Sequence, residues 1–279
     1  MSTVRPLRFT KMHGAGNDFA VIDLRGGQPA PPAARVRAMG HRHTGIGFDQ
    51  LLTIEDANRT DCVARYRIWN ADGSPAQQCG NGARCVAAWL RRDGAAAGRH
   101  FMLDSPTGPV DVECRDDGHY RLDLGRPEFA PARIPFVADL EDRRYTLALG
   151  KERVTFGAVS MGNPHAVIEV AAVEMAPVHE WGPALQASDE FPEGVNVGFA
   201  QVLDHDRIRL RVYERGAGET LACGSGACAA VAVLVRQGRI GREVFVELPG
   251  GTLEIHWPSD TAAITMAGPA AFVFEGEFA

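Results

Sequence analysis

The chain contains the segments RIWNADGSPAQQCGNGA (67–83) and RVYERGAGETLACGSGA (211–227), which align without a gap at an offset of 144 residues. A second pair of segments, AGNDFAVID (15–23) and MGNPHAVIE (161–169), aligns in the same order at an offset of 146. Two copies of so long a unit are too few and too large for a solenoid, in which short repeats stack. The repeat therefore predicts two homologous domains, one in each half of the chain.

Both halves contain the same kinds of predicted element. Two helices are expected, at 80–93 and 224–237, each followed by a glycine suited to a helix C-terminus. The second helix is apolar on nearly all sides, as is typical of a helix inside a core. Gly, Pro, Asn and Asp separate eleven predicted strands. These strands are FAVIDL (19–24), QLLTIE (50–55), CVARYRIW (62–69), PVDVEC (109–114), YRLDLG (120–125), YTLALG (145–150), HAVIEV (165–170), RIRLRVYE (207–214), EVFVEL (243–248), GTLEIHW (251–257) and AAITMAG (262–268).

These elements predict the fold class. We expect an α/β (α+β) protein of two pseudo-symmetric domains, each a mixed sheet wrapped around a central buried helix. The segment LGRPEFAPARI (124–134) is the predicted linker between the domains.

Composition excludes several classes of partner. The 279 residues are 45% hydrophobic and carry a net charge of −6, with no block of like charges. That balance argues against nucleic acid or an anionic membrane surface as the main partner. The N-terminal stretch MSTVRPLRFTKMHGAGNDF (1–19) has no signal-peptide pattern, and no apolar run reaches the length of a membrane span. We therefore expect a cytoplasmic protein, in which the six cysteines are reduced thiols.

Cys79 and Cys223 each stand immediately before a predicted helix, within the repeated motif. A helix N-terminus presents unpaired N–H groups and positive potential, so we expect a lowered thiol pKa at both positions. The glycines that follow let a ligand approach the backbone and make each turn an anion site. Two facing copies would supply one acid–base thiol on each side of a carbon, as racemisation requires.

Other functions fit less well. The spacings Cys79-x5-Cys85 and Cys223-x4-Cys228 are poor for zinc, so we expect no metal. GNGARC and GSGACA only partly match a dinucleotide-binding turn. Cys–His nucleophilic catalysis would explain one cysteine motif but not two. Lys11 and Lys151 are the only lysines, and nothing marks either as a pyridoxal phosphate anchor, so cofactor-free chemistry is favoured.

Seven motifs, in order along the chain, resemble those of the diaminopimelate epimerase family. They are FTKMHGAGNDF (9–19), GFDQ (47–50), NADGS (70–74), QCGNGARC (78–85), MGNPH (161–165), GVNVGF (194–199) and ERGAGETLACGSGACA (214–229). The resemblance implies a cofactor-independent enzyme that interconverts LL- and meso-diaminopimelate for lysine and peptidoglycan synthesis. It implies an N-terminal domain of residues 1–124, to which residues 269–279 return, a C-terminal domain of residues 125–268, and an active site in the cleft between them.

The same resemblance implies a role for each site residue. In the LL-to-meso direction Cys79 would be the proton donor and Cys223 the proton acceptor, with His165 and Glu214 supporting catalysis. Substrate-binding positions would be Asn17, Gln50, Asn70, Gly80, Asn81, Asn163, Asn196, Glu214, Arg215, Gly224 and Ser225. Their register between the halves favours a site over ordinary turn chemistry, because Gln50 and Asn196 share the offset of 146 and Asn70 and Glu214 that of 144.

Two departures from the family pattern concern assembly and one loop. Phe274 stands where members commonly have a tyrosine at a dimer contact, and Pro75–Ala76 replace an acidic residue. We still expect a homodimer, because the aromatic packing is kept. Another two-cysteine amino-acid racemase, of the proline racemase type, is the alternative function. A non-catalytic thiol or metal-binding protein is the alternative from a different class.

Overall fold

A computed structural model of the chain describes residues 6–77 and 79–279. Residues 1–5 of the predicted N-terminal domain and Gln78, which opens the QCGNGARC motif, lie outside the described residues. The chain forms two compact units: unit 1 comprises residues 1–122 and 268–279, and unit 2 comprises residues 123–267.

Unit 1 is a mixed sheet with two helices, α1 (Ala33–Gly40) and α2 (Gly80–Asp93). Its strands follow the spatial order β18-β1-β2-β3-β4-β6-β7-β8, and the short β5 pairs with β4. They are β1 (Leu7–Gly14), β2 (Asn17–Asp23), β3 (Gln50–Glu55), β4 (Cys62–Asn70), β5 (Pro75–Ala76), β6 (His100–Ser105), β7 (Gly108–Cys114), β8 (Tyr120–Asp123) and β18 (Ala271–Phe278).

Unit 2 repeats this plan, with the helices α3 (Val178–Gln186) and α4 (Gly224–Arg236) and the 3₁₀ turns η1 (Pro131–Arg133) and η2 (Val173–Met175). Its strands follow the order β9-β10-β11-β12-β13-β15-β16-β17, and β14 pairs with β13. They are β9 (Tyr145–Leu149), β10 (Glu152–Ser160), β11 (Pro164–Glu169), β12 (Asn196–Asp204), β13 (Arg207–Glu214), β14 (Gly218–Thr220), β15 (Glu243–Leu248), β16 (Gly251–His256) and β17 (Thr265–Gly268).

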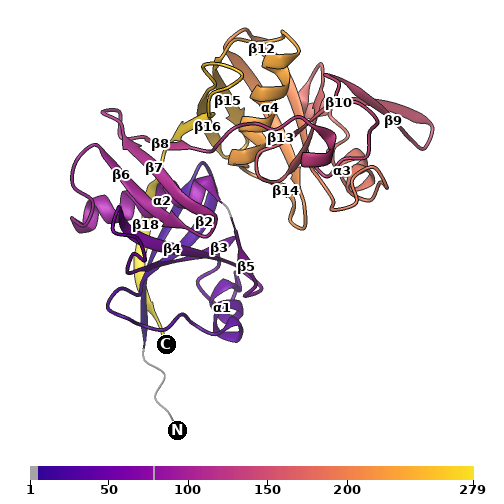
Figure 1. The fold of residues 1–279 in the computed structure, drawn as a ribbon. Coiled ribbons are helices and arrows are strands. Elements are labelled where there is room, and N and C mark those ends of the chain that lie inside the picture. Colours follow the sequence, from indigo (N-terminus) through magenta and orange to yellow (C-terminus); the bar gives the residue numbers. More distant parts are fainter. Residues whose placement is uncertain (1–5, 78) are drawn as a thin grey trace. The chain divides into compact units, whose positions relative to one another are not determined.

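The two sheets have the same topology, which confirms the predicted mixed α/β fold of two repeated halves. In each, a parallel pair (β2 with β3, β11 with β12) joins two antiparallel hairpins, and a second parallel pair (β4 with β6, β13 with β15) follows. The register agrees as well, because Phe19 lies opposite Gln50 and His165 lies opposite Asn196. β18 pairs with β1 in unit 1 in the same way that β9 pairs with β10 in unit 2 (Figure 1). Unit 1 therefore takes this strand from the end of the chain, whereas unit 2 takes the equivalent strand from its own beginning.

Both predicted helices form where the cysteine motifs place their starts. α2 spans the predicted residues 80–93 and ends at Gly94, whose φ of 83° lies in the left-handed region that glycine adopts readily. α4 ends one residue before the prediction, with Gln237 as its C-cap. Every residue from Gly226 to Leu234 is buried, and α4 contacts β10–β13 and β16 of its own unit. The apolar sequence of α4 therefore lets the helix lie buried against the strands of unit 2.

Several elements were not predicted. They are the strands β1, β5, β6, β10, β12, β14 and β18, the helices α1 and α3, and the turns η1 and η2. β10 and β12 are buried over several consecutive residues, so they lack the alternation that marks a half-exposed strand. α3 contains Pro183 and lacks a side-chain N-cap, both of which weaken a helix prediction. Among the described residues, no helix is both long enough and apolar enough to cross a membrane.

Candidate active site

Cys79 is the N-cap of α2, and one backbone group and one side chain contact its sulfur. The Sγ accepts the Gly82 N–H at 3.4 Å, and the thiol donates to Asn17 Oδ1 at 3.6 Å. Gly82 leaves room here, because a Cβ at this position would lie 3.1 Å from Leu52 Cδ2, a tight contact, and 3.5 Å from the sulfur. The first turn of α2 therefore brings the thiol and the N–H groups of the helix start to one place in unit 1.

Cys223 has the equivalent place in unit 2. Its Sγ accepts the Gly226 N–H at 3.4 Å, and a Cβ on Gly226 would lie 3.2 Å from that sulfur. The thiol also donates to Glu214 Oε2 at 3.0 Å, and Ser225 Oγ lies 3.6 Å away. Thr220 Oγ1 donates to the other oxygen of Glu214. A carboxylate that can take the thiol proton thus lies in direct contact with Cys223.

The expectation of a lowered thiol pKa is wrong for Cys223. Burial raises its pKa well above the ordinary value, and the negative charge and hydrogen bond of Glu214 raise it further. The Ser225 hydroxyl and the Gly226 N–H act in the opposite direction but do not outweigh them. Cys223 therefore rests as a neutral thiol that donates to a carboxylate.

The polar residues of unit 1 gather at the ends of its central strands. Asn17 opens β2 and donates to Asp49 Oδ2 at 2.7 Å, while its Oδ1 accepts from Asn81 Nδ2 at 3.3 Å. Gln50 opens β3 and donates to Asn70 Oδ1 at 3.1 Å, directly across the β3–β4 pair. These four carboxamides and Cys79 make up the sequence-predicted residues of unit 1, together with Gly80, the first residue of α2.

Unit 2 holds a second polar chain. His165 Nε2 and Asn163 Oδ1 are 2.9 Å apart, and Asn163 Nδ2 donates to Ser225 Oγ at 3.5 Å. Burial, with a smaller contribution from Arg215, lowers the pKa of His165 to about 3, so the ring is neutral and donates Nε2–H to the carbonyl of Asn163. Contacts thereby link five predicted residues in this order: His165, Asn163, Ser225, Cys223 and Glu214.

Asn196 and Arg215 form a separate pair beside this chain. Asn196 opens β12, donates to Pro164 O at 3.0 Å, and accepts the Arg215 N–H at 3.0 Å. The Arg215 guanidinium donates to Glu193 O at 2.7 Å, and the residue is exposed. Gly224, the remaining predicted residue, begins α4 directly after Cys223.

Some residues in contact with the site were missed by sequence reasoning. Thr220 holds Glu214, Asp49 holds Asn17, and Arg84, which is fully buried, donates to Asn81 Oδ1 at 2.8 Å. The internal repeat could not identify Asp49 or Arg84, because their counterparts at offsets of 146 and 144 are Val195 and Cys228.

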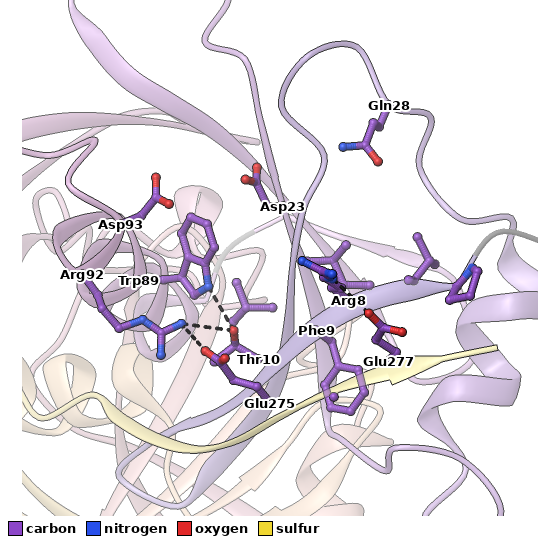
Figure 2. Close-up of a pocket in the computed structure, with 15 residues that line it drawn as sticks. Arg8, Phe9, Thr10, Asp23, Gln28, Trp89, Arg92, Asp93, Glu275 and Glu277 are labelled. Carbon is purple, nitrogen blue, oxygen red and sulfur yellow. Dashed lines mark hydrogen bonds and ion pairs between the residues drawn. The ribbon is translucent and has the colours of Figure 1, made fainter.

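Phe274 lies away from this polar cluster, on β18. Its ring meets Phe9 edge-on at 5.8 Å, and nearly half of the residue is exposed. A cavity of about 930 Å³ lies nearby, along β1, β2 and the end of α2. Figure 2 shows Trp89 and Arg92 reaching Thr10, and Arg92 paired with Glu275 at 2.6 Å. None of the residues that line this cavity belongs to the predicted catalytic or substrate-binding set.

A metal site has one candidate among the residues that the structure describes. Asp204, His205 and Asp206 lie within reach of one another at the exposed β12–β13 turn. This group contains no residue of the predicted site.

Comparison with known proteins places the chain in a family. The family model described as diaminopimelate epimerase matches residues 9–130 and 157–273. Proteins named diaminopimelate epimerase are 57% identical in Xanthomonas euvesicatoria and 58% identical in Xanthomonas campestris, each over 98% of this chain and 96% of the relative.

Solved structures agree at the level of the fold. A probable proline racemase from Agrobacterium radiobacter is 18% identical with a TM-score of 0.70, over 98% of this chain and 93% of that protein. A phenazine biosynthesis protein of the PhzF family from Bacillus anthracis is 17% identical with a TM-score of 0.70, over 99% and 100%. Together with the family model and the relatives that share more than half of its residues, this shows that the chain belongs to the diaminopimelate epimerase family.

Proposed function

We propose that the protein interconverts LL-2,6-diaminopimelate and meso-diaminopimelate without a cofactor, in the synthesis of lysine and peptidoglycan precursors. Family membership supports the substrate, and the two thiols at helix N-termini support the chemistry. The observation that carries the mechanism is the 3.0 Å contact between Cys223 Sγ and Glu214 Oε2, because it gives one thiol an immediate proton acceptor.

The proposed reaction moves three protons. In the LL-to-meso direction, Cys223 passes its proton to Glu214, and the resulting thiolate removes the α-hydrogen of the substrate. The C–H electron pair delocalises into the substrate carboxylate, and a new S–H bond forms on Cys223. The thiol of Cys79 then gives its proton to the opposite face of the same carbon and becomes the thiolate. After the product leaves, proton exchange with water removes the proton from Glu214 and returns one to Cys79, which restores the starting state. The reverse direction exchanges the roles of the two cysteines.

This reaction needs one cysteine from each unit. We therefore propose an active site in a cleft between an N-terminal domain of residues 1–124, with residues 269–279, and a C-terminal domain of residues 125–268. The N–H groups of the two helix starts, at Gly80–Asn81 and Gly224–Ser225, would bind the reacting carboxylate as negative charge develops on it.

The remaining polar groups would bind the rest of the substrate. Arg215 can form a bidentate pair with a carboxylate once it leaves Glu193 O. Buried His165 would hold Asn163 in place as a neutral donor rather than as a base, because its pKa is about 3. The other substrate-binding residues of this proposal are Asn17, Gln50, Asn70 and Asn196.

Deuterium incorporation tests the function directly. LL-diaminopimelate incubated with the protein in D2O should form the meso isomer with deuterium at the inverted α-carbon, and Cys79→Ala or Cys223→Ala should abolish the conversion. Diaminopimelate should also turn over far better than proline. A comparable kcat/KM for proline, or no solvent deuterium in the product, would contradict the assignment.

We further propose a cytoplasmic homodimer with β18 at or beside the contact. Phe272, Val273 and Phe274 are consecutive on this strand and 40%, 55% and 49% exposed. Exposed large apolar side chains on an edge strand favour an interface with another protein surface. Phe274 would supply the aromatic packing that a tyrosine gives in other members.

A further inference from the structure

A directed chain of hydrogen bonds runs through unit 1 to Cys79. Arg84 Nη2 donates to Asn81 Oδ1 at 2.8 Å, Asn81 Nδ2 donates to Asn17 Oδ1 at 3.3 Å, and Asn17 Nδ2 donates to Asp49 Oδ2 at 2.7 Å. A guanidinium can only donate and a carboxylate can only accept. Because these two groups lie at its ends, this chain of hydrogen bonds is complete only when the oxygen of each carboxamide faces the Arg84 end and its NH2 group faces the Asp49 end. Asn17 therefore turns its carbonyl oxygen, and not its NH2 group, toward the thiol of Cys79.

Both ends of the chain are held by further contacts. Arg84 is fully buried, and its Nε donates to Pro269 O at 3.2 Å, in the segment that leads to β18. Asp49 accepts from Arg42 Nη2 at 2.6 Å and from the Asp18 N–H at 3.1 Å. The direction of the two amides is thus fixed from outside the site.

Unit 2 uses the equivalent asparagine in the opposite sense. Neutral His165 donates to Asn163 Oδ1, so the NH2 group of Asn163 points to Ser225 Oγ, which lies 3.6 Å from Cys223 Sγ. The residues equivalent to Asp49 and Arg84 are Val195 and Cys228, which cannot impose the direction seen in unit 1. One cysteine therefore meets an amide oxygen, whereas the other meets a hydroxyl group and a carboxylate.

We propose that Asp49 and Arg84 are positioning residues that fix the Asn17 carbonyl on Cys79 and so keep this cysteine in its proton-bearing form. The chemical reason is that an amide oxygen accepts a hydrogen bond from a thiol but repels a thiolate, and it cannot itself be protonated near neutral pH. Glu214, by contrast, can take the proton of Cys223. The proposal rests on the proposed function only in treating Cys79 as the proton donor.

Few titratable groups would disturb a measurement on Cys79. Tyr66 on β4 and Cys85 in α2 are the buried groups on which the charge of Cys79 acts. Burial raises the pKa of Cys85 to about 12 and that of Tyr66 further, so both stay neutral across the range in which Cys79 is titrated. Arg84 keeps its charge throughout.

The test compares Asp49→Leu with Asp49→Asn in the full-length protein. Both variants remove the same charge, but only asparagine keeps an oxygen that accepts from Asn17 and the Asp18 N–H. The measurement is the rate of Cys79 alkylation by iodoacetamide from pH 6 to pH 10, followed by mass spectrometry of the peptide. In Asp49→Leu the 2.7 Å contact to Asp49 is lost and only the longer 3.3 Å contact from Asn81 Nδ2 still holds Asn17. Asn17 can then turn its NH2 group to the sulfur, which stabilises the thiolate. We expect its labelling midpoint to lie about one pH unit or more below that of Asp49→Asn, a tenfold difference in thiolate fraction at low pH.

The outcomes separate this proposal from the proposed function. Equal midpoints in the two variants would overturn the positioning role. A shifted midpoint in a protein that does not turn over diaminopimelate would leave the positioning role standing and remove the function. If Asp49→Leu does not fold, the other end of the chain gives the same comparison. Asp49 still holds Asn17 when Arg84 alone is replaced, so this comparison is made in the Asp49→Asn background. There Arg84→Met releases Asn81 and should lower the Cys79 midpoint, whereas Arg84→Lys keeps a donor on Asn81 and should not; equal values would again overturn the proposal.

Discussion

Replacing Glu214 by glutamine should move the turnover and the thiol reactivity of Cys223 in opposite directions. The substitution keeps an oxygen that can accept the thiol hydrogen bond but removes the group that can take its proton. Cys223 Sγ and Glu214 Oε2 are 3.0 Å apart, and two unit charges at that distance repel by roughly 5 kcal/mol at an effective dielectric of about 20. The doubly charged pair is therefore disfavoured by a factor of about 10⁴, so thiolate and carboxylate do not coexist and the pair shares one proton.

This argument gives two expected results for Glu214→Gln. Loss of the internal proton acceptor should lower kcat in both directions by roughly 10²- to 10⁴-fold, the usual contribution of a positioned base. Loss of the negative charge removes one cause of the raised pKa of Cys223, so its alkylation near pH 8 should become faster. Coupled turnover assays and peptide-resolved alkylation measure the two quantities on the same preparation.

Glu219→Gln is the matched control for this experiment. Glu219 also lies close to the end of β13, but it pairs with Arg211 at 2.6 Å and does not contact Cys223. Its replacement should leave kcat within about twofold, as is usual for a residue outside the chemistry. Unchanged kcat in Glu214→Gln, or turnover and labelling that fall together, would refute the role given to the carboxylate.

Two further predictions concern stability and assembly. His165 has a folded pKa of about 3, below its unfolded value, so the unfolded chain binds the extra proton and stability is lost as the pH falls from about 6.5 toward 3. Between pH 7 and pH 5, urea unfolding should show that this loss of stability is roughly 2 kcal/mol. His165→Phe, which copies Phe19 of unit 1, should remove most of the loss. An equal loss in the wild type and the variant would contradict the argument. Phe274→Glu should convert the proposed dimer to a monomer, as measured by light scattering at micromolar concentration. Phe245→Glu, which changes an exposed position of unit 2, should leave the dimer intact. A monomeric wild type would exclude the interface.

α2 and α4 could be predicted because their own sequences specify a helix. The glycine after residues 80–93 and the unbroken apolar run from Ala227 to Val235 decide α2 and α4 locally. β1 and β12 could not be predicted in the same way, because they are buried over consecutive residues and their strand pairing is fixed by distant segments. α1 and α3 are short and lack side-chain N-caps, so tertiary contacts decide them.

The candidate site shows the same division. The repeat identified residues that occur in both halves, such as Gln50 and Asn196 at equivalent strand starts. It could not identify Asp49, Arg84 or Thr220, because each acts through a contact that only the folded chain creates. The thiol environment was predicted wrongly for Cys223, since the helix N-terminus is visible in sequence but the depth of burial and the facing carboxylate are not.

The pairing of β1 with β18 has a consequence for how the protein is made. Leu7 lies opposite Phe278, so the first and last strands of the chain are neighbours. Unit 2 is one continuous stretch of residues 123–267, and all of it has been synthesised before β18 exists. The ribosome therefore delivers a complete second unit while the first still lacks a strand, which reverses the usual order in which N-terminal parts finish first. Until β18 has left the ribosome, the β18-facing side of β1 is an open strand edge, the kind of surface on which nascent chains associate wrongly.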